Sequence, residues 1–186
     1  MNKKTEVVDL EKVVVKFAGD SGDGMQLTGS QFTETSALIG NDLATFPDFP
    51  AEIRAPQGTV PGVSGFQAHI GRIEINTPGD IADVLVSMNP AALKANKDYI
   101  RKGGTIIVNI DTFTKRDFEK AGYETNPLEG DDFEGFNIIE APITKLTRET
   151  LKDSNLDGKS IGRSKNMFAL GIVYWMFNRK MERTEK

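Results

Sequence analysis

A glycine-rich turn is the feature of this sequence best suited to chemistry. Residues 19–24 have the sequence Gly-Asp-Ser-Gly-Asp-Gly and follow a mainly β-branched run at 13–18. Turns between a first strand and a helix are where α/β proteins bind ligands, often through phosphate groups. The spacing G-x-x-G-x-G differs, however, from the dinucleotide fingerprint G-x-G-x-x-G, and the lysine of a P-loop is missing after the last glycine. Neither nucleotide motif is therefore present here.

Two carboxylates in this turn oppose a bound phosphate. A helix N-terminus favours an anion by roughly 0.3 to 1 kcal/mol. One carboxylate at about 4 Å opposes it by about 1 kcal/mol in water and about 4 kcal/mol at an effective dielectric of about 20. With Asp20 and Asp23 both present, a bare phosphate is disfavoured. The alternative is a structural turn in which Asp23 caps the following helix.

Residues 22–24 also resemble the start of the thiamine diphosphate motif, in which the aspartate holds Mg²⁺. That motif needs asparagines roughly 25 to 30 residues further on. In this chain Asn41 comes too early and Asn76 too late. Thiamine binding by this segment is therefore not expected.

Three cations are candidates for contact with an anionic ligand. Arg54 is the only cation in the proline-rich segment 47–62, which we expect to be an ordered, functional loop. Its guanidinium could hold a carboxylate or phosphate through two hydrogen bonds, or be simply exposed or ion-paired. Arg163 and Lys165 lie at the start of the last predicted helix, where positive charge opposes the helix dipole. A ligand anion or an acidic partner surface would stabilise them; otherwise both are solvated.

Composition limits the chemistry that the chain itself can perform. Its 186 residues include no cysteine, which excludes disulfides, thiolate nucleophiles, Cys-ligated zinc and thiolate-held iron–sulfur clusters. Redox chemistry, if present, would then take place on a partner. The only histidine, His69, has no second ligand at metal-binding spacing, so we expect it to be structural. The 23 basic and 27 acidic residues give a net charge of -4, which disfavours nucleic acid as a partner.

Two stretches of the sequence bear on whether the chain enters a membrane and on where in the cell it is located. The first twelve residues lack the apolar run of a signal peptide, so we expect a cytoplasmic protein. Residues 167–177 are apolar throughout, but eleven residues are too few to span a bilayer. This segment predicts a buried helix, and no membrane partner is expected.

The periodicity of the chain predicts an α/β fold. Strands are predicted at 13–18, 43–46, 83–88, 105–110 and 137–141, and helices at 24–39, 90–101, 117–121, 144–152 and 165–177, with a polar loop at 153–162. Gly71-Arg72, between the alternating segments 66–70 and 73–75, predicts a type II′ hairpin. The expected fold is three-layered and Rossmann-like: a mixed, mostly parallel sheet with helices on both faces and one β-hairpin.

One domain is expected, covering residues 1–178, and residues 179–186 resemble the start of a linker or a C-terminal tail. The core face of the first helix is predicted from steps of four and three residues: Met25, Gly29, Phe32, Ser36 and Ile39. Small residues at two of these positions predict that the helix lies close against its neighbour.

Four segments together resemble one enzyme family. Residues 19–29, 47–54, 83–89 and 166–171 are similar to the gamma domain of 2-oxoacid:ferredoxin oxidoreductases, and the similarity covers nearly the whole chain. The Gly-Asp-Ser-Gly-Asp-Gly turn is similar to the form in which this domain is fused at the N-terminus of the alpha subunit of 2-oxoglutarate-type enzymes. Stand-alone gamma subunits more often have Gly-Gly-Gln-Gly there.

The resemblance implies a component of a larger enzyme that is inactive alone. Such complexes oxidatively decarboxylate a 2-oxoacid, pass electrons to ferredoxin and release an acyl-CoA. It implies that thiamine diphosphate, Mg and the 4Fe-4S clusters lie on partners, namely thiamine-binding alpha and beta chains or domains and a ferredoxin-like component. The chain itself would bind no cofactor alone. It would contribute the side of the assembly that receives coenzyme A, together with domain interfaces.

The same resemblance implies site residues but no catalytic residue and no metal ligand in this chain. Six positions match the family pattern: Gly19, Ser21, Gly22, Gly24, Arg54 and Asn166. The preferred hypothesis is that Arg54 and the pair Arg163 and Lys165 face the anionic ligand. The turn would then position the domain against the thiamine-binding part. Departures from the pattern at Asp20, Asp23 and residues 55–56 weigh against direct contact between the turn and a phosphate of coenzyme A.

Two other classes of function stay open on the sequence alone. One is a free-standing oxidoreductase domain that binds a nucleotide cofactor, which would require binding of NAD or FAD by the isolated chain. The other is a purely structural subunit that only contacts its neighbours. Binding assays on the assembled complex would separate the second class from a role toward coenzyme A.

Overall fold

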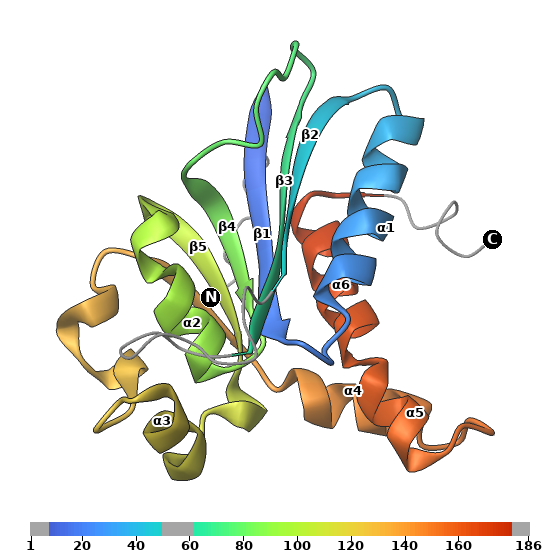
Figure 1. Cartoon of the computed structure of the whole chain (residues 1–186). Helices are drawn as coiled ribbons and strands as arrows, with labels where there is room; N and C mark the ends of the chain where they lie inside the picture. The colour runs from blue at the N-terminus through green and yellow to red at the C-terminus, as the bar shows by residue number, and fades with distance from the viewer. Residues whose placement is uncertain (1–7, 50–61, 180–186) are drawn as a thin grey trace, which may run out of the picture.

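The computed structural model describes residues 8–49 and 62–179, which form a six-stranded sheet covered by helices (Figure 1). The strands are β1 (Lys12–Asp20), β2 (Asp42–Asp48), β3 (Val63–Gly71), β4 (Ala82–Ser87), β5 (Ile100–Asn109) and β6 (Asn137–Ala141). The helices are α1 (Met25–Leu38), α2 (Pro90–Asn96), α3 (Lys115–Ala121), α4 (Ile143–Leu151), α5 (Gly158–Arg163) and α6 (Lys165–Met176). Short 3₁₀ turns are η1 (Lys97–Tyr99), η2 (Ile110–Thr112), η3 (Pro127–Glu129) and η4 (Asp131–Phe133).

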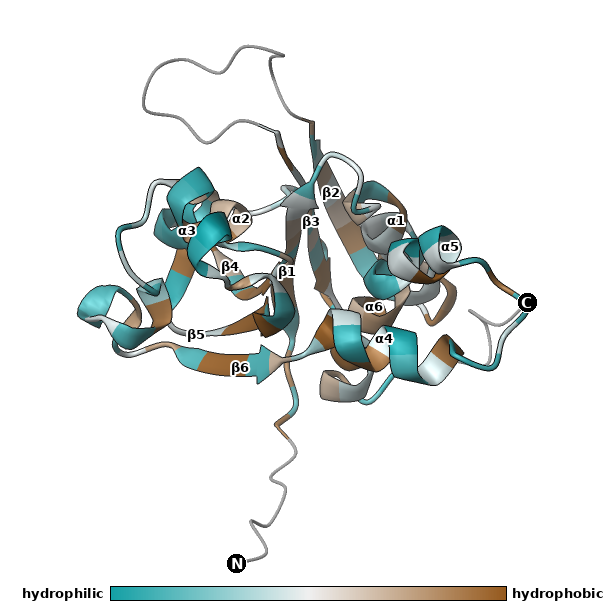
Figure 2. Ribbon diagram, turned by 90° about the horizontal axis from the view of Figure 1, so that it is seen from below, coloured by the Kyte–Doolittle hydropathy of each residue, from teal (hydrophilic) through white to brown (hydrophobic). Residues whose placement is uncertain are grey.

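The sheet is mixed, as predicted, with the order β2-β3-β1-β4-β5-β6. Strands β1, β4, β5 and β6 run parallel, so their carboxyl ends share one edge. Strand β3 runs antiparallel to both of its neighbours, β1 and β2. Seen from the carboxyl edge, α1, α4, α5 and α6 lie on one side of the sheet and α2 and α3 on the other (Figure 2). The predicted three-layer, Rossmann-like α/β fold is confirmed.

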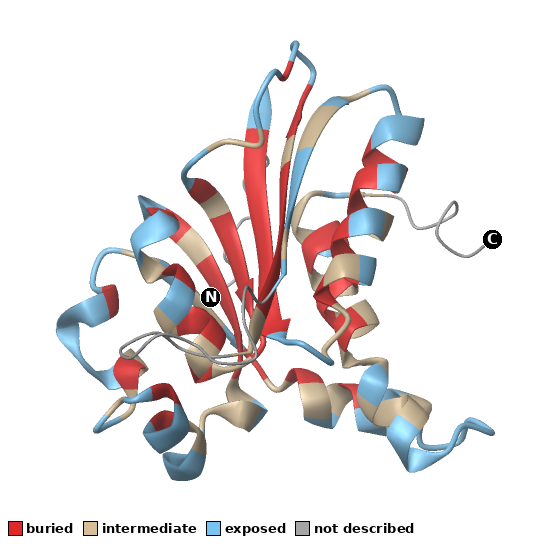
Figure 3. Cartoon of the chain, viewed as in Figure 1, coloured by how far each residue is buried: buried red, intermediate tan, exposed pale blue. Residues whose placement is uncertain are grey.

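Clusters of apolar residues lie at both interfaces between the sheet and its helices. Figure 3 marks the buried residues on both sides of the sheet. On the side of α1 and α6, the ring of Phe32 lies 5.7 Å from that of Phe17 and 6.1 Å from that of Tyr174. On the other side, Leu93 of α2 is fully buried in a cluster with Leu85. Strand β1 has seven consecutive buried residues because both of its faces are covered. Its largely apolar sequence, with three successive valines, is typical of such a central strand.

Helix α1 packs close to the sheet because of Gly29. A Cβ at this position would run into the ring of Phe66 on β3. Met25, Phe32 and Ser36 are also buried, as predicted, which confirms most of the expected core face. Ile39 is the exception, because it lies beyond the end of α1 and is 53% exposed.

The predicted hairpin at Gly71-Arg72 is wrong in its position. Residues 73–75 form no strand, because β3 already has a partner along each edge and leaves none free for a third. The antiparallel neighbour that precedes β3 in sequence is β2. The segment after β3 is held instead by side chains of that strand: His69 Nδ1 lies 2.7 Å from the Thr77 carbonyl oxygen, and Gln67 donates to the Pro78 carbonyl.

Two other element boundaries differ from the predictions. The helix predicted to reach residue 101 ends at Asn96, followed by η1 and then β5 from Ile100, which is buried. The predicted polar loop at 153–162 contains α5, because the Asp157 carboxylate accepts hydrogen bonds from the backbone N–H groups of Lys159 and Ser160. The predicted edge strand at 137–141 and the last helix are confirmed. Within the described residues, no helix is both long enough and apolar enough to cross a membrane.

Candidate functional site

The glycine turn closes on itself at the carboxyl end of β1. The Asp23 N–H donates to the Asp20 carbonyl at 2.9 Å, and Asp23 Oδ2 accepts from the Asp20 N–H at 3.1 Å. Gly24 has φ +73°, a left-handed conformation that favours glycine. The prediction that Asp23 caps α1 is wrong: its carboxylate turns back into the turn, and in the described structure no side chain caps this helix.

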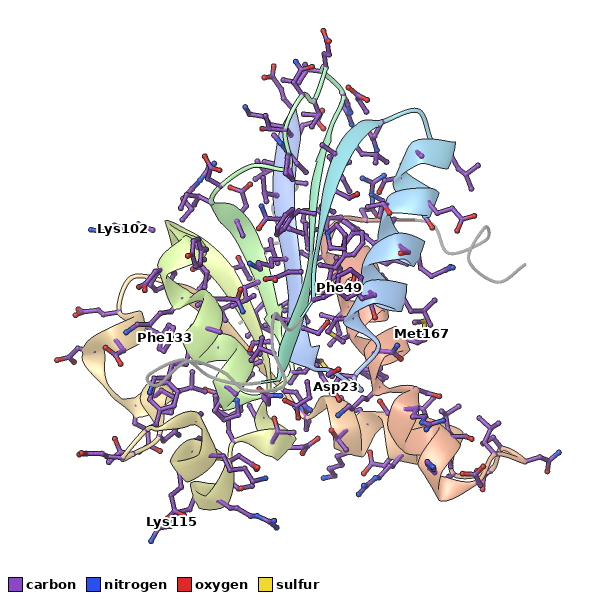
Figure 4. All side chains as sticks on the ribbon, in the orientation of Figure 1. Asp23, Phe49, Lys102, Lys115, Phe133 and Met167 are labelled. Atoms are coloured by element: carbon purple, nitrogen blue, oxygen red, sulfur yellow. The ribbon has the colours of Figure 1, made fainter. Side chains whose placement is uncertain are left out.

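A partly buried ion pair joins the turn to the start of α6. Lys165 Nζ lies 2.8 Å from Asp23 Oδ1. The side chain of Lys165 is 20% exposed, and that of Asp23, which is labelled in Figure 4, is 11% exposed. The anion that was expected to stabilise Lys165 is therefore supplied by this chain. Arg163 differs, because it is the last residue of α5, where a cation is favourable to the helix dipole, and its side chain is exposed.

Asn166 and Gly24 fit directly against each other. The buried Asn166 amide donates to the Gly24 carbonyl at 3.4 Å, and its Oδ1 accepts from the Met167 N–H at 2.8 Å. A Cβ at residue 24 would collide with the Asn166 amide. Glycine is thus required at position 24 both by φ and by space. The structure brings these two predicted site residues together although 142 residues separate them in sequence.

Asp20 connects the turn to α2. Its Oδ1 accepts from the Asn89 amide at 2.7 Å, while Asn89 Oδ1 caps α2 by accepting from the Ala92 N–H at 2.8 Å. Burial raises the pKa of the Asp20 carboxyl, and the neighbouring Asp23 carboxylate raises it further. The link between Asp20 and Asn89 was missed by the sequence analysis, although a helix was predicted to begin at residue 90.

The remaining predicted site residues that the structure describes lie in the turn, and they differ in exposure. Gly19 is buried beside Met88, whereas Ser21 and Gly22 are exposed. The Ser21 N–H donates to the Gly62 carbonyl at 3.0 Å, which ties the turn to the start of β3. Arg54 lies outside the described residues, as does most of the proline-rich segment.

Gln26 is a further residue that the sequence analysis missed. Its amide donates to the carbonyl oxygens of Asp48 at 3.3 Å and Gly65 at 2.6 Å. It therefore fixes the end of β2 and the start of β3 to the first turn of α1. No local pattern marks this glutamine, because its partners come from two distant strands.

Two clefts open along the carboxyl edge of the sheet. The first, of about 400 Å³, lies where α1 leaves β1 on one face and α2 leaves β4 on the other. Ligands of open α/β sheets bind at such a switch point. It is lined by Asp20, Asp23, Met88, Asn89, Pro90, Ala91, Thr112, Asp117, Lys120 and Lys165. The second, of about 500 Å³, is lined by Asp111, Thr112, Thr144, Lys145, Arg148, Glu149 and Lys165.

The charges of the two clefts differ. The first carries three carboxylates against two ammonium groups, and the second carries three cations against two carboxylates. Lys165 lies between them and lines both. Because Lys165 is already paired with Asp23, the charges of the second cleft are close to balanced, and an anionic group is opposed less there than in the glycine turn. Among the described residues, no group of three or more His, Cys, Asp or Glu side chains could hold a metal ion.

The family model for pyruvate ferredoxin/flavodoxin oxidoreductase matches residues 14–186. The chain belongs to this family. It is 54% identical over 176 residues to the 2-oxoglutarate oxidoreductase subunit KorA of Mycobacterium tuberculosis, a match that covers 95% of this chain and 27% of that protein. The chain thus spans about a quarter of the length of this curated relative.

Solved structures of relatives share the fold. The 2-oxoglutarate:ferredoxin oxidoreductase from Magnetococcus marinus, solved with 2-oxoglutarate, coenzyme A and succinyl-CoA bound, is 26% identical with a TM-score of 0.69, over 95% of this chain and 26% of that chain. The gamma subunit of a keto/oxoacid ferredoxin oxidoreductase from Geobacter sulfurreducens is 17% identical with a TM-score of 0.62, over 89% of this chain and 78% of that chain. The second likeness supports the fold alone.

Proposed function

We propose that this chain is the gamma component of a 2-oxoacid:ferredoxin oxidoreductase that acts on 2-oxoglutarate. The enzyme would decarboxylate the 2-oxoacid, pass two electrons to ferredoxin and release the acyl group as its coenzyme A thioester. The observation that carries this proposal is the 54% identity to a 2-oxoglutarate oxidoreductase subunit over 95% of the chain. The Magnetococcus enzyme, solved with the same classes of substrate and product, supports it.

The absence of cysteine from all 186 residues supports a division of labour within the complex. Thiolate-held 4Fe-4S clusters need cysteines and would lie on a partner. Thiamine diphosphate and Mg would likewise lie on partner chains or domains, since the Gly-Asp-Gly sequence of the turn lacks the asparagines of the complete motif. By itself the chain would be catalytically inactive. A cytoplasmic location and a domain boundary near residue 178 stay predictions.

Within this complex, the carboxyl edge of the sheet would form the side that receives coenzyme A. The glycine turn, with Gly19, Ser21, Gly22 and Gly24, would position the domain and not hold phosphate, because its two carboxylates disfavour an anion. Arg54, Arg163 and Lys165 would face the anionic parts of the ligand, and Asn166 would hold the turn in place. Lys165 retains donors for this role, because an ammonium group has three and its partner carboxylate takes one.

The test uses the assembled enzyme and separates its two half-reactions. Arg163→Gln should raise the KM for coenzyme A about tenfold, because one charged hydrogen bond is worth roughly 1.5 kcal/mol. Decarboxylation without coenzyme A should be unchanged. Lys102→Gln, at an exposed lysine near the amino end of β5, is the matched control and should leave both steps unchanged (Figure 4).

Three outcomes would count against the proposal. An unchanged KM for coenzyme A in Arg163→Gln and in Arg54→Ala would remove the role toward coenzyme A and leave a purely structural subunit. An equal loss of decarboxylation in Arg163→Gln would show that Arg163 does not act specifically in the coenzyme A step. Turnover of 2-oxoglutarate by this chain without any partner would refute its assignment as one component of an enzyme.

A further inference from the structure

Most charged groups that line the first cleft are already paired within the domain. Asp23 has Lys165 beside Oδ1, and its Oδ2 accepts from the Asp20 N–H. Asp117 has Lys120 beside Oδ1, and its Oδ2 accepts from a threonine hydroxyl. Both oxygens of each of these carboxylates thus have a partner, and each carboxylate is matched by an ammonium group of the same cleft.

Asp20 and Asn89 are the exception in this lining. Asp20 Oδ1 accepts from the Asn89 amide at 2.7 Å, but Oδ2 has no hydrogen bond or ion pair with any of residues 8–49 and 62–179. The Asn89 amide group has two N–H donors, of which one is used by Asp20. Its oxygen is taken by the Ala92 N–H. A free acceptor therefore lies beside a free donor in the cleft.

Uncharged side chains complete the lining. Met88 follows β4, and Pro90 and Ala91 begin α2. Small-molecule sites are clefts of about 300 to 1,000 Å³ with mostly apolar walls and a few placed polar groups. The first cleft, of about 400 Å³, has this character. Because the Asp20 carboxylate opposes an anion, the cleft favours an uncharged planar group that donates one hydrogen bond and accepts another.

Adenine has this pattern on the edge that carries its amino group. The amino group donates, and the ring nitrogen beside it accepts. Enzymes that enclose a base read such an edge with hydrogen bonds and hold the ring between apolar side chains. In this cleft the acceptor would be Asp20 Oδ2 and the donor would be the second N–H of Asn89.

We propose that the first cleft binds the adenine base of a nucleotide, with Asp20 accepting from its amino group and Asn89 donating to the adjacent ring nitrogen. The inference rests on the proposed function, in which coenzyme A is the nucleotide. Its phosphates would lie outside the cleft, past Lys165, which also lines the second cleft. The glycine turn then contacts the uncharged part of the ligand, although its carboxylates oppose phosphate.

The experiment measures equilibrium binding to the assembled enzyme by calorimetry. The two probes are the adenosine bisphosphate that forms the nucleotide end of coenzyme A and its purine counterpart, in which hydrogen replaces the amino group. The wild-type enzyme should bind the adenine form about tenfold more tightly, because the purine form lacks one hydrogen bond to a charged group. Asp20→Ala should bind both forms equally. Asp98→Ala, at an exposed aspartate beyond the other end of α2, is the control and should keep the difference.

A second variant tests the cavity without changing its hydrogen bonds. Ala91→Leu places a larger side chain in the lining and should weaken binding of both forms. Competition then identifies the source of the base. Displacement of the bisphosphate by coenzyme A would show that the two share the cleft. Binding of adenosine monophosphate that coenzyme A does not displace would identify a free adenine nucleotide as the ligand.

Three results would overturn the proposal. Equal affinity of the wild-type enzyme for the two forms, or failure to bind either, would show that no group reads the amino group. A tenfold preference that survives Asp20→Ala would assign the reading to another residue. Unchanged affinity in Ala91→Leu would place the base outside this cleft. Binding is measured without turnover, so an enzyme that forms no acyl-CoA from 2-oxoglutarate would contradict the proposed function separately.

Discussion

The ion pair between Asp23 and Lys165 yields the most direct test of the physical account. Its N–O distance is 2.8 Å, and its side chains are 11% and 20% exposed. Exposed pairs contribute roughly 0.2 to 1 kcal/mol, whereas removing one partner of a fully buried pair costs roughly 3 to 5 kcal/mol. Asp23→Asn keeps the shape of the side chain and an acceptor for the Asp20 N–H, so the loss is mainly that of the charge. We expect a cost of about 2 kcal/mol.

The assay is thermal and urea unfolding of the 186-residue chain in a double-mutant cycle. For a chain of this length, a loss of 2 kcal/mol corresponds to a fall in Tm of about 4 to 8 °C. Lys165→Met removes the ammonium group, and combining it with Asp23→Asn isolates the interaction between the two side chains. The expected coupling free energy is about 2 kcal/mol, with little dependence on salt.

A surface pair of similar length supplies the control. Arg72 and Asp9 approach to 3.1 Å, but their side chains are 68% and 81% exposed. Asp9→Asn should therefore cost less than about 0.5 kcal/mol. A coupling free energy between Asp23 and Lys165 below about 0.5 kcal/mol, or a cost for Asp23→Asn no larger than that for Asp9→Asn, would refute the inference that this pair fixes the turn to α6.

Three other predictions can be checked by unfolding experiments. Gly29→Ala should destabilise the chain by roughly 2 kcal/mol, because the new methyl group would collide with the ring of Phe66 on β3. Gly171→Ala has open space beside it and should stabilise α6 by roughly 0.5 to 1 kcal/mol. Equal effects of the two substitutions would contradict the close packing of Gly29 against β3. Tyr174→Phe should cost about 1 kcal/mol, because it removes the hydroxyl that contacts both Thr35 Oγ1 and the Gln31 carbonyl, and a neutral result would deny that these hydrogen bonds contribute. The pKa of Asp20 is higher in the folded chain than in the unfolded chain, so the folded chain holds this proton more tightly. The free energy of unfolding therefore falls as the pH rises from the pKa of the unfolded state to that of the folded state. Asp20→Asn should remove that fall and stabilise the chain at pH 7, by at most about 0.5 kcal/mol, and an unchanged pH profile would disprove it.

The sequence alone indicated those features that depend on neighbours within a strand or a helical turn. The β-branched run at 13–18 predicted a buried central strand, and the spacing of Met25, Gly29 and Phe32 predicted the core face of α1. Counting the charges of the glycine turn also argued against a phosphate site there. The first cleft, which the turn borders, has more carboxylates than ammonium groups.

Features that depend on the order of the strands could not be obtained in this way. The alternation around Gly71 predicted a hairpin, but β3 lies inside the sheet with both edges paired, which no local pattern reveals. Asp23 had the residue type and position of a helix cap. Its carboxylate instead turns away from α1 toward Lys165, which comes near only because α6 packs beside α1.

Local spacing predicted the α/β class, and composition excluded thiolate chemistry from these 186 residues, because both follow from residue types and short-range periodicity. The family was indicated by the resemblance of four segments to known members. Tertiary structure alone decided how the site residues are used: Lys165 pairs with Asp23, and Asn166 donates to the Gly24 carbonyl. The physical reason is distance along the chain. Contacts across more than a hundred residues are set by how the helices pack on the sheet, and local propensities carry no record of that packing.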